Sequence, residues 1–236
     1  MVMEPEKLII QANDEESVTG LLYPAAKAKR AGSTIVLGHG AGGNQLSGFM
    51  RLFAQGLASR GLDTMTFNFI YSEKGRGAPD PKPKLESCYR AVIETALSHK
   101  KLKQNRLFIG GKSMGGRIAS QVAANEAIAH SSISHSLAGL VFLGYPLHPP
   151  GKPEQLRDKH LKDIKAPMLV VQGTRDAFGT SDELKAVIKR LRLRATLHPI
   201  EEGDHSFKVP KRVGSQDEIY EQIMDRIELW ADELSK

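Results

Sequence analysis

The chain has 236 residues, of which 40% are apolar and 25% charged, and a formal net charge of +6 at pH 7. These proportions describe an ordinary globular protein, neither disordered nor membrane-embedded. No apolar run approaches the roughly 20 residues that span a bilayer. The segment from Met1 to Lys7 lacks the apolar stretch of a secretory signal, and the single Cys88 excludes an intramolecular disulfide framework. We therefore expect one domain over residues 1–236, located in the cytoplasm.

The positive net charge raises the question of nucleic-acid or membrane binding. The basic residues are dispersed, however, and even the stretch from Lys152 to Lys165 interleaves Glu154, Asp158 and Asp163 among its lysines. A nucleic-acid surface needs a clustered cationic face. We interpret the charge as solvated surface and expect a small-molecule substrate, with a basic nucleic-acid module as the less favoured alternative.

Strands alternate with helices along the chain, which predicts a mostly parallel sheet with helices on both faces. Two short β-like segments, Lys7 to Gln11 and Val18 to Tyr23, flank a polar stretch and predict an opening hairpin. A compact apolar strand follows over Thr34 to Leu37. The next helix repeats apolar residues at a period close to 3.6, namely Leu46, Met50, Phe53 and Leu57.

The same alternation continues to the end of the chain. The expected elements are a strand over Thr64 to Phe69, a loop over Tyr71 to Lys84, a helix over Leu85 to Ser98, a strand over Arg106 to Gly110, a helix over Met114 to Ala127 and a strand over Leu140 to Leu143. After a Pro-rich connection over His148 to Lys162 come a strand over Met168 to Gln172, a helix over Asp182 to Leu193, a strand over Ala195 to Ile200 and a helix over Gln216 to Leu234. The last helix carries an apolar stripe that predicts core packing for Trp230 and Leu234.

The strongest functional signal is the pentapeptide from Gly111 to Gly115, a G-x-S-x-G that follows a predicted strand and opens a helix. In that context the serine sits on a sharp turn, and the small flanking residues let neighbouring backbone approach. The N-terminal amides of the helix lie where negative charge develops during attack on a carbonyl. The pattern predicts Ser113 as a nucleophile; a glycine-rich helix start with a capping serine is the alternative.

A serine hydroxyl needs a neighbouring base, and that base needs an orienting carboxylate. Asp176 follows the strand over Met168 to Gln172, and His205 lies between the last strand and the final helix. The order Ser, acid, His is that of α/β-hydrolases. The sequence therefore predicts a catalytic triad of Ser113, Asp176 and His205.

Three other acids compete with Asp176. Asp204 adjoins His205, but neighbouring loop residues usually point apart. Asp158 and Asp163 lie in the long connection after the preceding strand, too far from its end to be preferred.

The glycine-rich loop from Gly38 to Gly43 follows an early core strand. Such a loop can aim backbone N–H groups at a tetrahedral oxyanion, which needs two donors. We expect one donor to be the amide of Met114 and the other that of Ala41, with Gly42 as second choice. His39 is expected to hold the loop in shape beside the substrate.

Loops above the carboxyl edge of the sheet set specificity in open α/β folds. The two insertions there, Tyr71 to Lys84 and Tyr145 to Lys162, are too short for a full cap domain, so an open or lightly covered site is expected. The predicted substrate-lining residues are His39, Gly42, Tyr145 and His148. We interpret Lys74, Arg76 and Arg117 as solvated charges, with contact to an anionic substrate as the alternative, and expect partial burial rather than reactivity for Cys88.

With these motifs the chain resembles the α/β-hydrolase superfamily, and in particular its dienelactone-hydrolase-like branch. More narrowly, it looks like a group that contains testis-expressed hydrolase-like proteins and a subunit of a histone-acetyltransferase-associated complex. The resemblance is carried by the segments Leu37 to Gly43, Gly111 to Arg117, Gly144 to Pro150 and Leu156 to Asp158.

The resemblance implies a serine hydrolase with Ser113 as nucleophile, Asp176 as acid and His205 as base. Dienelactone hydrolases themselves use a cysteine nucleophile, so Ser113 departs from them. The expected reaction is hydrolysis of a small carboxylic ester or thioester through an acyl-enzyme, with no metal and no organic cofactor. The alternative is a catalytically silent protein of the same fold that acts as a binding or scaffold subunit for a protein partner.

Overall fold

The computed structural model describes residues 4–26, 30–128 and 132–234. Within these ranges the chain forms one eight-stranded sheet in the order β1-β2-β4-β3-β5-β6-β7-β8. The strands are β1 (Glu6–Gln11), β2 (Ser17–Tyr23), β3 (Ser33–Gly38), β4 (Leu62–Phe67), β5 (Arg106–Lys112), β6 (Leu137–Leu143), β7 (Met168–Gly173) and β8 (Ala195–Ile200). The predicted opening hairpin is confirmed, because β1 and β2 pair antiparallel, and from β4 to β8 all neighbours pair parallel.

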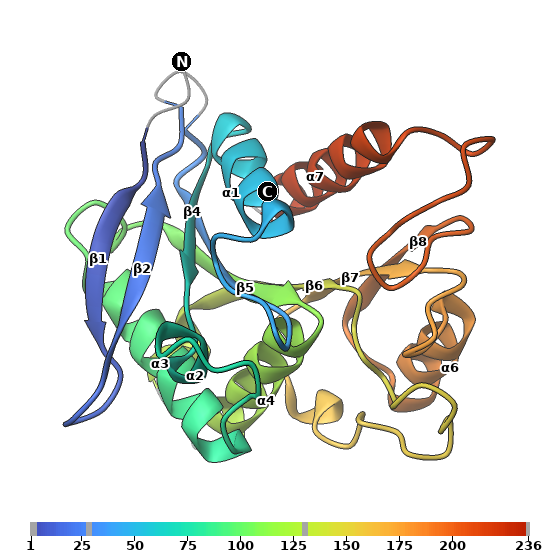
Figure 1. Ribbon diagram of the computed structural model, residues 1–236, viewed down its shortest axis with the longest axis horizontal. Coiled ribbons are helices and arrows are strands. Elements are labelled where there is room, and N and C mark those ends of the chain that lie inside the picture. The colour runs from blue at the N-terminus through green and yellow to red at the C-terminus, as the bar shows by residue number, and fades with distance from the viewer. Residues whose placement is uncertain (1–3, 27–29, 129–131, 235–236) are drawn as a thin grey trace.

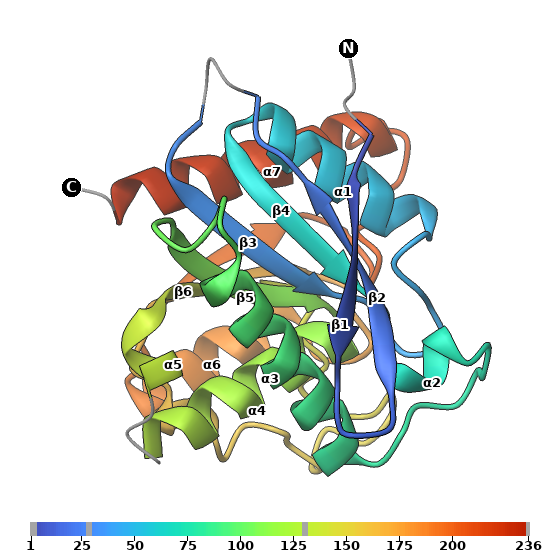
Figure 2. The same cartoon turned by 90° about the vertical axis from the view of Figure 1, so that its left-hand side faces the viewer.

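Helices cover both faces of this sheet, as predicted (Figures 1 and 2). They are α1 (Gly48–Ser59), α2 (Ile70–Glu73), α3 (Lys82–Ser98), α4 (Met114–Ile128), α5 (Ser132–Ser136), α6 (Ser181–Leu191) and α7 (Gln216–Glu233), with the 3-10 turn η2 (Leu161–Asp163). Successive residues of a strand point to opposite faces. In β3, Ile35 and Leu37 therefore belong to the hydrophobic cluster that includes residues of α1 and α7, whereas Val36 belongs to the cluster on the other face, where α3 and α4 contact β3.

Most of the predicted core positions are buried. Met50, Phe53 and Leu57 of α1 and Trp230 of α7 are each at most 3% exposed, so their predicted packing is confirmed. The prediction for Leu46 was wrong: α1 begins only at Gly48, after Ser47 caps it, and Leu46 is 59% exposed.

The ends of several elements differ from the sequence prediction. The α3 helix begins at Lys82 instead of Leu85, because Pro81 and Pro83 suit a helix start, where a missing N–H costs little. The α2 and α5 helices were not predicted. Leu234 closes α7 and is 38% exposed, so the core stripe ends at Trp230.

The connections above the carboxyl edge of the sheet are short. The segment between β4 and α3 contains only α2, and the segment between β6 and β7 contains only η2. Across the described residues the fold is thus an α/β-hydrolase fold without a full cap domain, as expected. No described helix is both long and apolar enough to cross a membrane.

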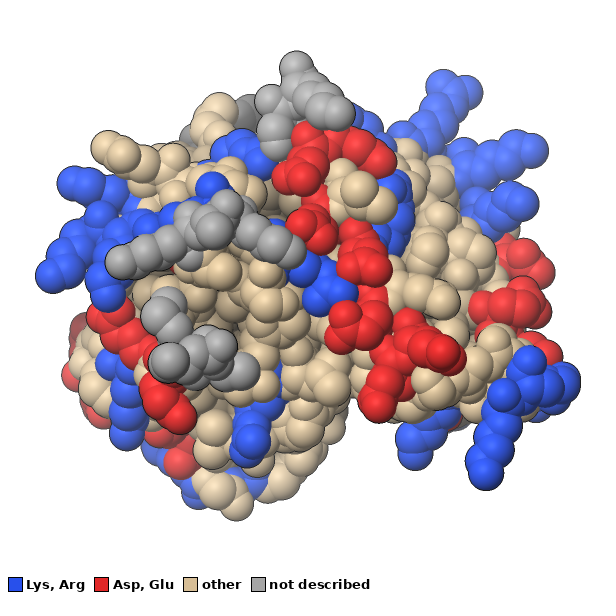
Figure 3. All heavy atoms as spheres, turned by 90° about the horizontal axis from the view of Figure 1, so that it is seen from above, with Lys and Arg blue, Asp and Glu red and all other residues tan. Residues whose placement is uncertain are grey.

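The surface charge is mixed. On the face formed by α1 and α7, acidic side chains make a band between groups of Lys and Arg (Figure 3). Part of this mixture is paired: Arg60 of α1 forms ion pairs of 2.6 Å with Glu221 and with Asp225 of α7. Such alternation of sign agrees with solvated surface charge and does not form the continuous cationic face that nucleic acid requires on this side of the molecule.

Candidate active site

Ser113 lies on the sharp turn between β5 and α4 and has a φ of +51°. A non-glycine residue in this region is strained, and such strain is common at functional sites. The turn is held because Ser113 N–H donates to Leu143 O at 3.0 Å and Arg117 N–H donates to Ser113 O at 3.1 Å. The turn presents the hydroxyl at the carboxyl edge of the sheet.

Glycine is required next to this turn because two backbones meet there. A Cβ on Gly115 would lie 2.1 Å from Gly38 O, and one on Gly111 would lie 2.2 Å from the same oxygen. Neither distance is tolerable for a carbon atom, and the obstacle is β3 backbone. The glycines of the G-x-S-x-G pentapeptide are therefore required because a side chain at either position would collide with the backbone of β3.

Gly115→Ala is therefore expected to destabilise the protein by about 3 kcal/mol or more, because either β3 or α4 has to move. Urea unfolding measures the change. Gly77→Ala is the matched control, since no atom lies within 4 Å of a Cβ at Gly77. A Gly115→Ala protein as stable as Gly77→Ala would contradict the close approach of the two backbones.

The structure brings Ser113, His205 and Asp176 into one hydrogen-bonded chain. His205 Nε2 lies 2.8 Å from Ser113 Oγ, and His205 Nδ1 lies 2.7 Å from Asp176 Oδ2. Since a carboxylate only accepts, Nδ1 carries the hydrogen and Nε2 is the acceptor for the Ser113 hydroxyl. Asp176 is 2% exposed, while the His205 side chain retains 20% exposure at the mouth of the site.

Asp176 is fixed by two groups that the sequence analysis did not single out. Gln172 Nε2 donates to Asp176 Oδ2 at 2.7 Å, and Phe178 N–H donates to Asp176 Oδ1 at 2.8 Å. The ring of Phe178 also packs on that of His205, with 4.3 Å between centroids. Gln172 could have been found from the sequence, because it is a polar residue at the end of an apolar strand. Nothing in the sequence indicated the role of Phe178 N–H.

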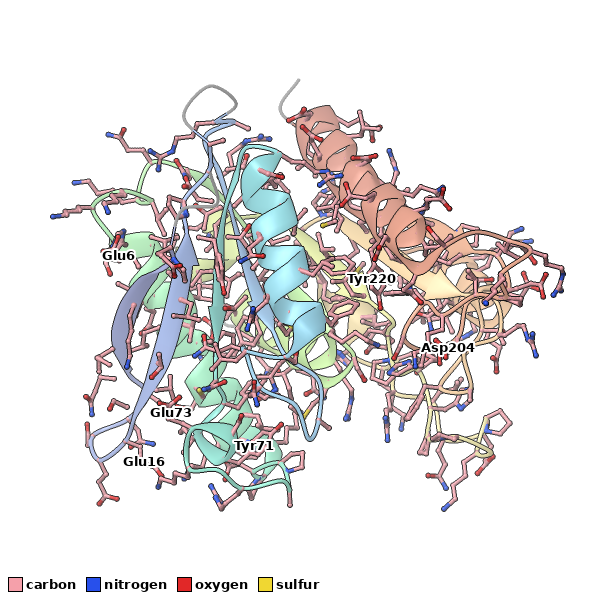
Figure 4. The ribbon with its side chains drawn as sticks, turned by 45° about the horizontal axis from the view of Figure 1, so that its top comes forward. Glu6, Glu16, Tyr71, Glu73, Asp204 and Tyr220 are labelled. Carbon is pink, nitrogen blue, oxygen red and sulfur yellow. The ribbon has the colours of Figure 1, made fainter. Side chains whose placement is uncertain are left out.

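The competing acids contact other groups. Asp204 Oδ1 accepts from Ser206 N–H at 2.7 Å and from Lys208 N–H at 2.9 Å, which closes the loop after β8. Figure 4 shows Asp204 in this loop near Tyr220. Asp158 forms an ion pair with Arg190, and Asp163 lies in η2.

The glycine-rich loop after β3 lies beside Ser113. Ala41 and Met114 both line the cavity at Ser113. Within the described residues neither backbone N–H has a hydrogen-bond acceptor, as two oxyanion donors require.

His39 is buried and both of its ring nitrogens are engaged. Nδ1 lies 2.8 Å from Gly40 O, and Nε2 accepts from Phe69 N–H at 3.2 Å. Burial lowers the pKa of His39, although the hydrogen bond to Gly40 O opposes the shift. These contacts tie the loop after β3 to the end of β4, as expected of a residue that holds the loop in shape.

The remaining predicted lining residues lie at or behind the rim. Gly42 is exposed, with a φ of +70°. Tyr145 is 1% exposed and donates its hydroxyl to Arg157 O at 2.9 Å. His148 is 5% exposed, and its Nε2 lies 3.2 Å from Glu183 Oε1. Contact of these residues with substrate stays a prediction.

A cavity of about 400 Å³ opens at Ser113. It is walled by α4, by the segment before α3 and by the β6–β7 connection, and its lining residues are Ala41, Pro79, Asp80, Lys82, Leu85, Ser113, Met114, Arg117, Ile118, Gln121, Pro146, Arg157 and Phe178. The cavity combines apolar walls with a few polar groups, as small-molecule sites do.

Lys112 precedes the candidate nucleophile, and its ammonium group is directed inward. Lys112 Nζ donates to His205 O and lies 5.5 Å from the ring centroid of Phe207. Burial lowers the pKa of Lys112 from 10.5 to about 8, although the negative charges of Asp176 and Asp204 oppose the shift. This burial could not be predicted from the sequence, because lysine is usually exposed.

The lowered pKa makes stability depend on pH. Between about pH 8 and 10.5 the unfolded chain binds more protons at Lys112 than the folded one, so the free energy of unfolding rises with pH in that window. Below pH 8 the penalty for burying the charge is fully present. The rise is expected to be at most about 3 kcal/mol, and Lys112→Met should lack it.

Urea unfolding at about pH 7.5, 8.5 and 9.5 measures this difference. Lys152→Met, which removes an exposed lysine, should follow the wild type. If the unfolding free energies of Lys112→Met and the wild type changed in parallel with pH, Lys112 would not titrate in this window.

No group of three or more His, Cys, Asp or Glu residues among the described positions is placed to hold a metal ion. Cys88 is fully buried, more than expected, and burial raises the pKa of its thiol to about 12.

The comparison with protein families settles the broader classification. The profile described as alpha/beta hydrolase domain matches residues 31–232. The chain belongs to this family. Its predicted fold is thereby confirmed, and so is the expected hydrolase class at the level of the family.

The match to an individual curated protein is partial. The chain is 32% identical over 128 residues to the quorum-quenching protein AidA of Acinetobacter baumannii (strain MDR-ZJ06), a match that covers 52% of this chain and only 40% of that relative.

Two solved structures share the fold. An alpha-beta serine hydrolase homologue from Coxiella burnetii superposes with a TM-score of 0.73 at 20% identity, over 96% of this chain and 99% of that one. A dienelactone hydrolase from Anabaena variabilis superposes with a TM-score of 0.69 at 18% identity, over 94% and 97%. The narrower likeness to testis-expressed proteins stays a prediction.

Proposed function

We propose that this chain is a serine hydrolase that cleaves a small carboxylic ester or thioester through an acyl-enzyme on Ser113. The observation that carries the proposal is the continuous chain from Ser113 Oγ through His205 to the buried Asp176, with separations of 2.8 and 2.7 Å. Nucleophile, base and orienting acid are each within hydrogen-bond reach of the next, which is the geometry that acyl transfer needs.

In the first step Ser113 Oγ attacks the substrate carbonyl while His205 Nε2 takes the hydroxyl proton. Asp176 stabilises the resulting imidazolium through Nδ1–H, and the backbone N–H groups of Met114 and Ala41 donate to the oxyanion. The tetrahedral intermediate collapses as His205 returns the proton to the departing alcohol or thiol. Water then attacks the acyl group with His205 again as base, which releases the acid and restores Ser113.

Further parts of the proposal follow from the same site. The substrate is a small molecule held in the cavity at Ser113, and the reaction uses no metal and no organic cofactor. A cytoplasmic location is proposed because the only cysteine is a buried free thiol and disulfides are rare in that compartment.

The acyl-enzyme distinguishes this mechanism from direct attack of water. Rapid mixing with p-nitrophenyl acetate should give a burst of p-nitrophenol, and quenched protein should carry an acetyl group on the peptide that contains Ser113. A panel of short- and medium-chain esters and thioesters then ranks substrates by kcat/KM. If the folded protein turned over no ester or thioester and formed no adduct, the catalytically silent binding subunit would replace the hydrolase.

A further inference from the structure

Two arginines line the cavity without an acidic partner. Arg117 projects from the first turns of α4, and Arg157 comes from the β6–β7 connection; both are half-buried. Neither forms an ion pair with any of the described residues. Arg117 Nε is buried without a hydrogen-bond partner there, and the side chain of Arg157 makes one long contact, 3.5 Å from Nη1 to Pro146 O.

The other charged residues of the cavity wall are compensated. Asp80 forms an ion pair of 2.7 Å with Arg76, and Lys82 lies 3.3 Å from Glu86. The surplus positive charge at this wall therefore comes from Arg117 and Arg157. Asp80 and Gln121 also line the cavity, and Asp80 Oδ2 and Gln121 Oε1 are buried acceptors without a hydrogen-bond partner among the described residues, so an anion is favoured only on the arginine side.

Arg117 and Arg157 line the same cavity, so their positive charges act on each other. The pKa of Arg157 is lowered first by burial and then by the positive charge of Arg117. Placing two like charges in a partly desolvated wall is unfavourable unless an anion joins them. The planar donors of arginine match the two oxygens of a carboxylate, which explains why arginine is common where carboxylates are bound.

We propose that Arg117 and Arg157 form a carboxylate-binding subsite, so that the substrate is an ester or thioester that also carries a free carboxylate. This inference rests on the proposed hydrolase function for its catalytic part, but the binding of the carboxylate does not depend on turnover. The interpretation of Arg117 as a solvated surface charge is thereby replaced, whereas Lys74 and Arg76 pair with Glu16 and Asp80.

Matched substrate pairs test the proposal. Mono-p-nitrophenyl adipate and p-nitrophenyl hexanoate differ by a terminal carboxylate on the acyl group. 4-Acetoxybenzoate and its methyl ester differ by one on the leaving group. In at least one pair the charged ester is expected to have a kcat/KM higher by about 10-fold or more, an advantage that shrinks as salt is raised.

Variants locate the subsite. Arg117→Met and Arg157→Met should each reduce the charged-to-neutral ratio of kcat/KM by roughly 10- to 100-fold. Arg51→Met removes an equal charge from an exposed position of α1, which lies on the opposite face of the sheet from α4, and should leave the ratio unchanged. The subsite would be overturned if the charged and neutral esters of both pairs had equal kcat/KM. It would also be overturned if the arginine variants lost as much kcat/KM on the neutral ester as on the charged one. Either result would leave the hydrolase proposal standing.

Binding provides a readout that is independent of catalysis. Ser113→Ala protein should bind the charged member of one pair about 10-fold more tightly than its neutral counterpart in calorimetry, and the added Arg157→Met change should abolish the difference. If the wild type hydrolysed nothing but this preference appeared, the hydrolase proposal alone would fail. Equal affinity within both pairs would overturn the subsite whatever the turnover.

Discussion

Ser113→Ala is expected to reduce ester hydrolysis by roughly 10⁴- to 10⁶-fold while the protein stays folded. The substitution removes the atom that attacks the carbonyl and leaves its surroundings in place, because the backbone bonds from Ser113 N to Leu143 O and from Arg117 N to Ser113 O do not involve the side chain. Alanine at a φ of +51° is strained about as much as serine. Initial rates on p-nitrophenyl butyrate measure the loss.

The stability of the Ser113→Ala protein serves as the control for its loss of activity. Urea unfolding should give a free energy within about 1 kcal/mol of the wild type. A folded Ser113→Ala protein that retained more than about a hundredth of the activity would show that the nucleophile lies elsewhere or that water is activated directly.

Asp176→Asn is expected to lower kcat by about 10⁴-fold. Asp176 Oδ2 accepts from both His205 Nδ1 and Gln172 Nε2, while Oδ1 accepts from Phe178 N–H. An asparagine that keeps its oxygen toward Phe178 turns an N–H toward the two side-chain donors. The His205 ring then adopts the other tautomer, and Nε2 no longer accepts the proton of Ser113.

Asp204→Asn separates this role from a general effect of negative charge near His205. The Asp204 oxygen that accepts from Ser206 N–H and Lys208 N–H is retained in asparagine, so the loop should hold its shape. Its kcat is expected to stay within about threefold of the wild type. Comparable losses in Asp176→Asn and Asp204→Asn would indicate that charge, rather than the hydrogen bond to His205, supports the reaction.

The arrangement of the three side chains could be predicted because it follows from topology. Ser113, Asp176 and His205 each come after a predicted parallel strand, and the carboxyl ends of such strands meet at one edge of the sheet. Order along the chain and distance from the strand ends therefore located residues far apart in sequence. The glycines around Ser113 likewise predicted that neighbouring backbone approaches this turn closely.

The groups that support this arrangement were harder to predict because they depend on side-chain packing. Tyr145 is predicted to line the site, but the bond that its hydroxyl donates to Arg157 O could not be predicted. Lys112 has the sequence signature of a surface residue, but its Nζ reaches the backbone of the His205 loop. Arg157 could not be singled out from the sequence, because only the path of the β6–β7 connection brings it to the cavity that Arg117 also lines.

The most direct test of the central claim is labelling of the wild-type protein with a fluorophosphonate, followed by peptide mass spectrometry. The probe forms a stable bond with an activated serine as fluoride departs, and no substrate has to be known. We predict modification of Ser113 alone, slowed strongly in Asp176→Asn and absent in Ser113→Ala. Failure of the folded protein to label between about pH 6 and 9, or labelling that persists in Ser113→Ala, would contradict the assignment of Ser113 as the nucleophile.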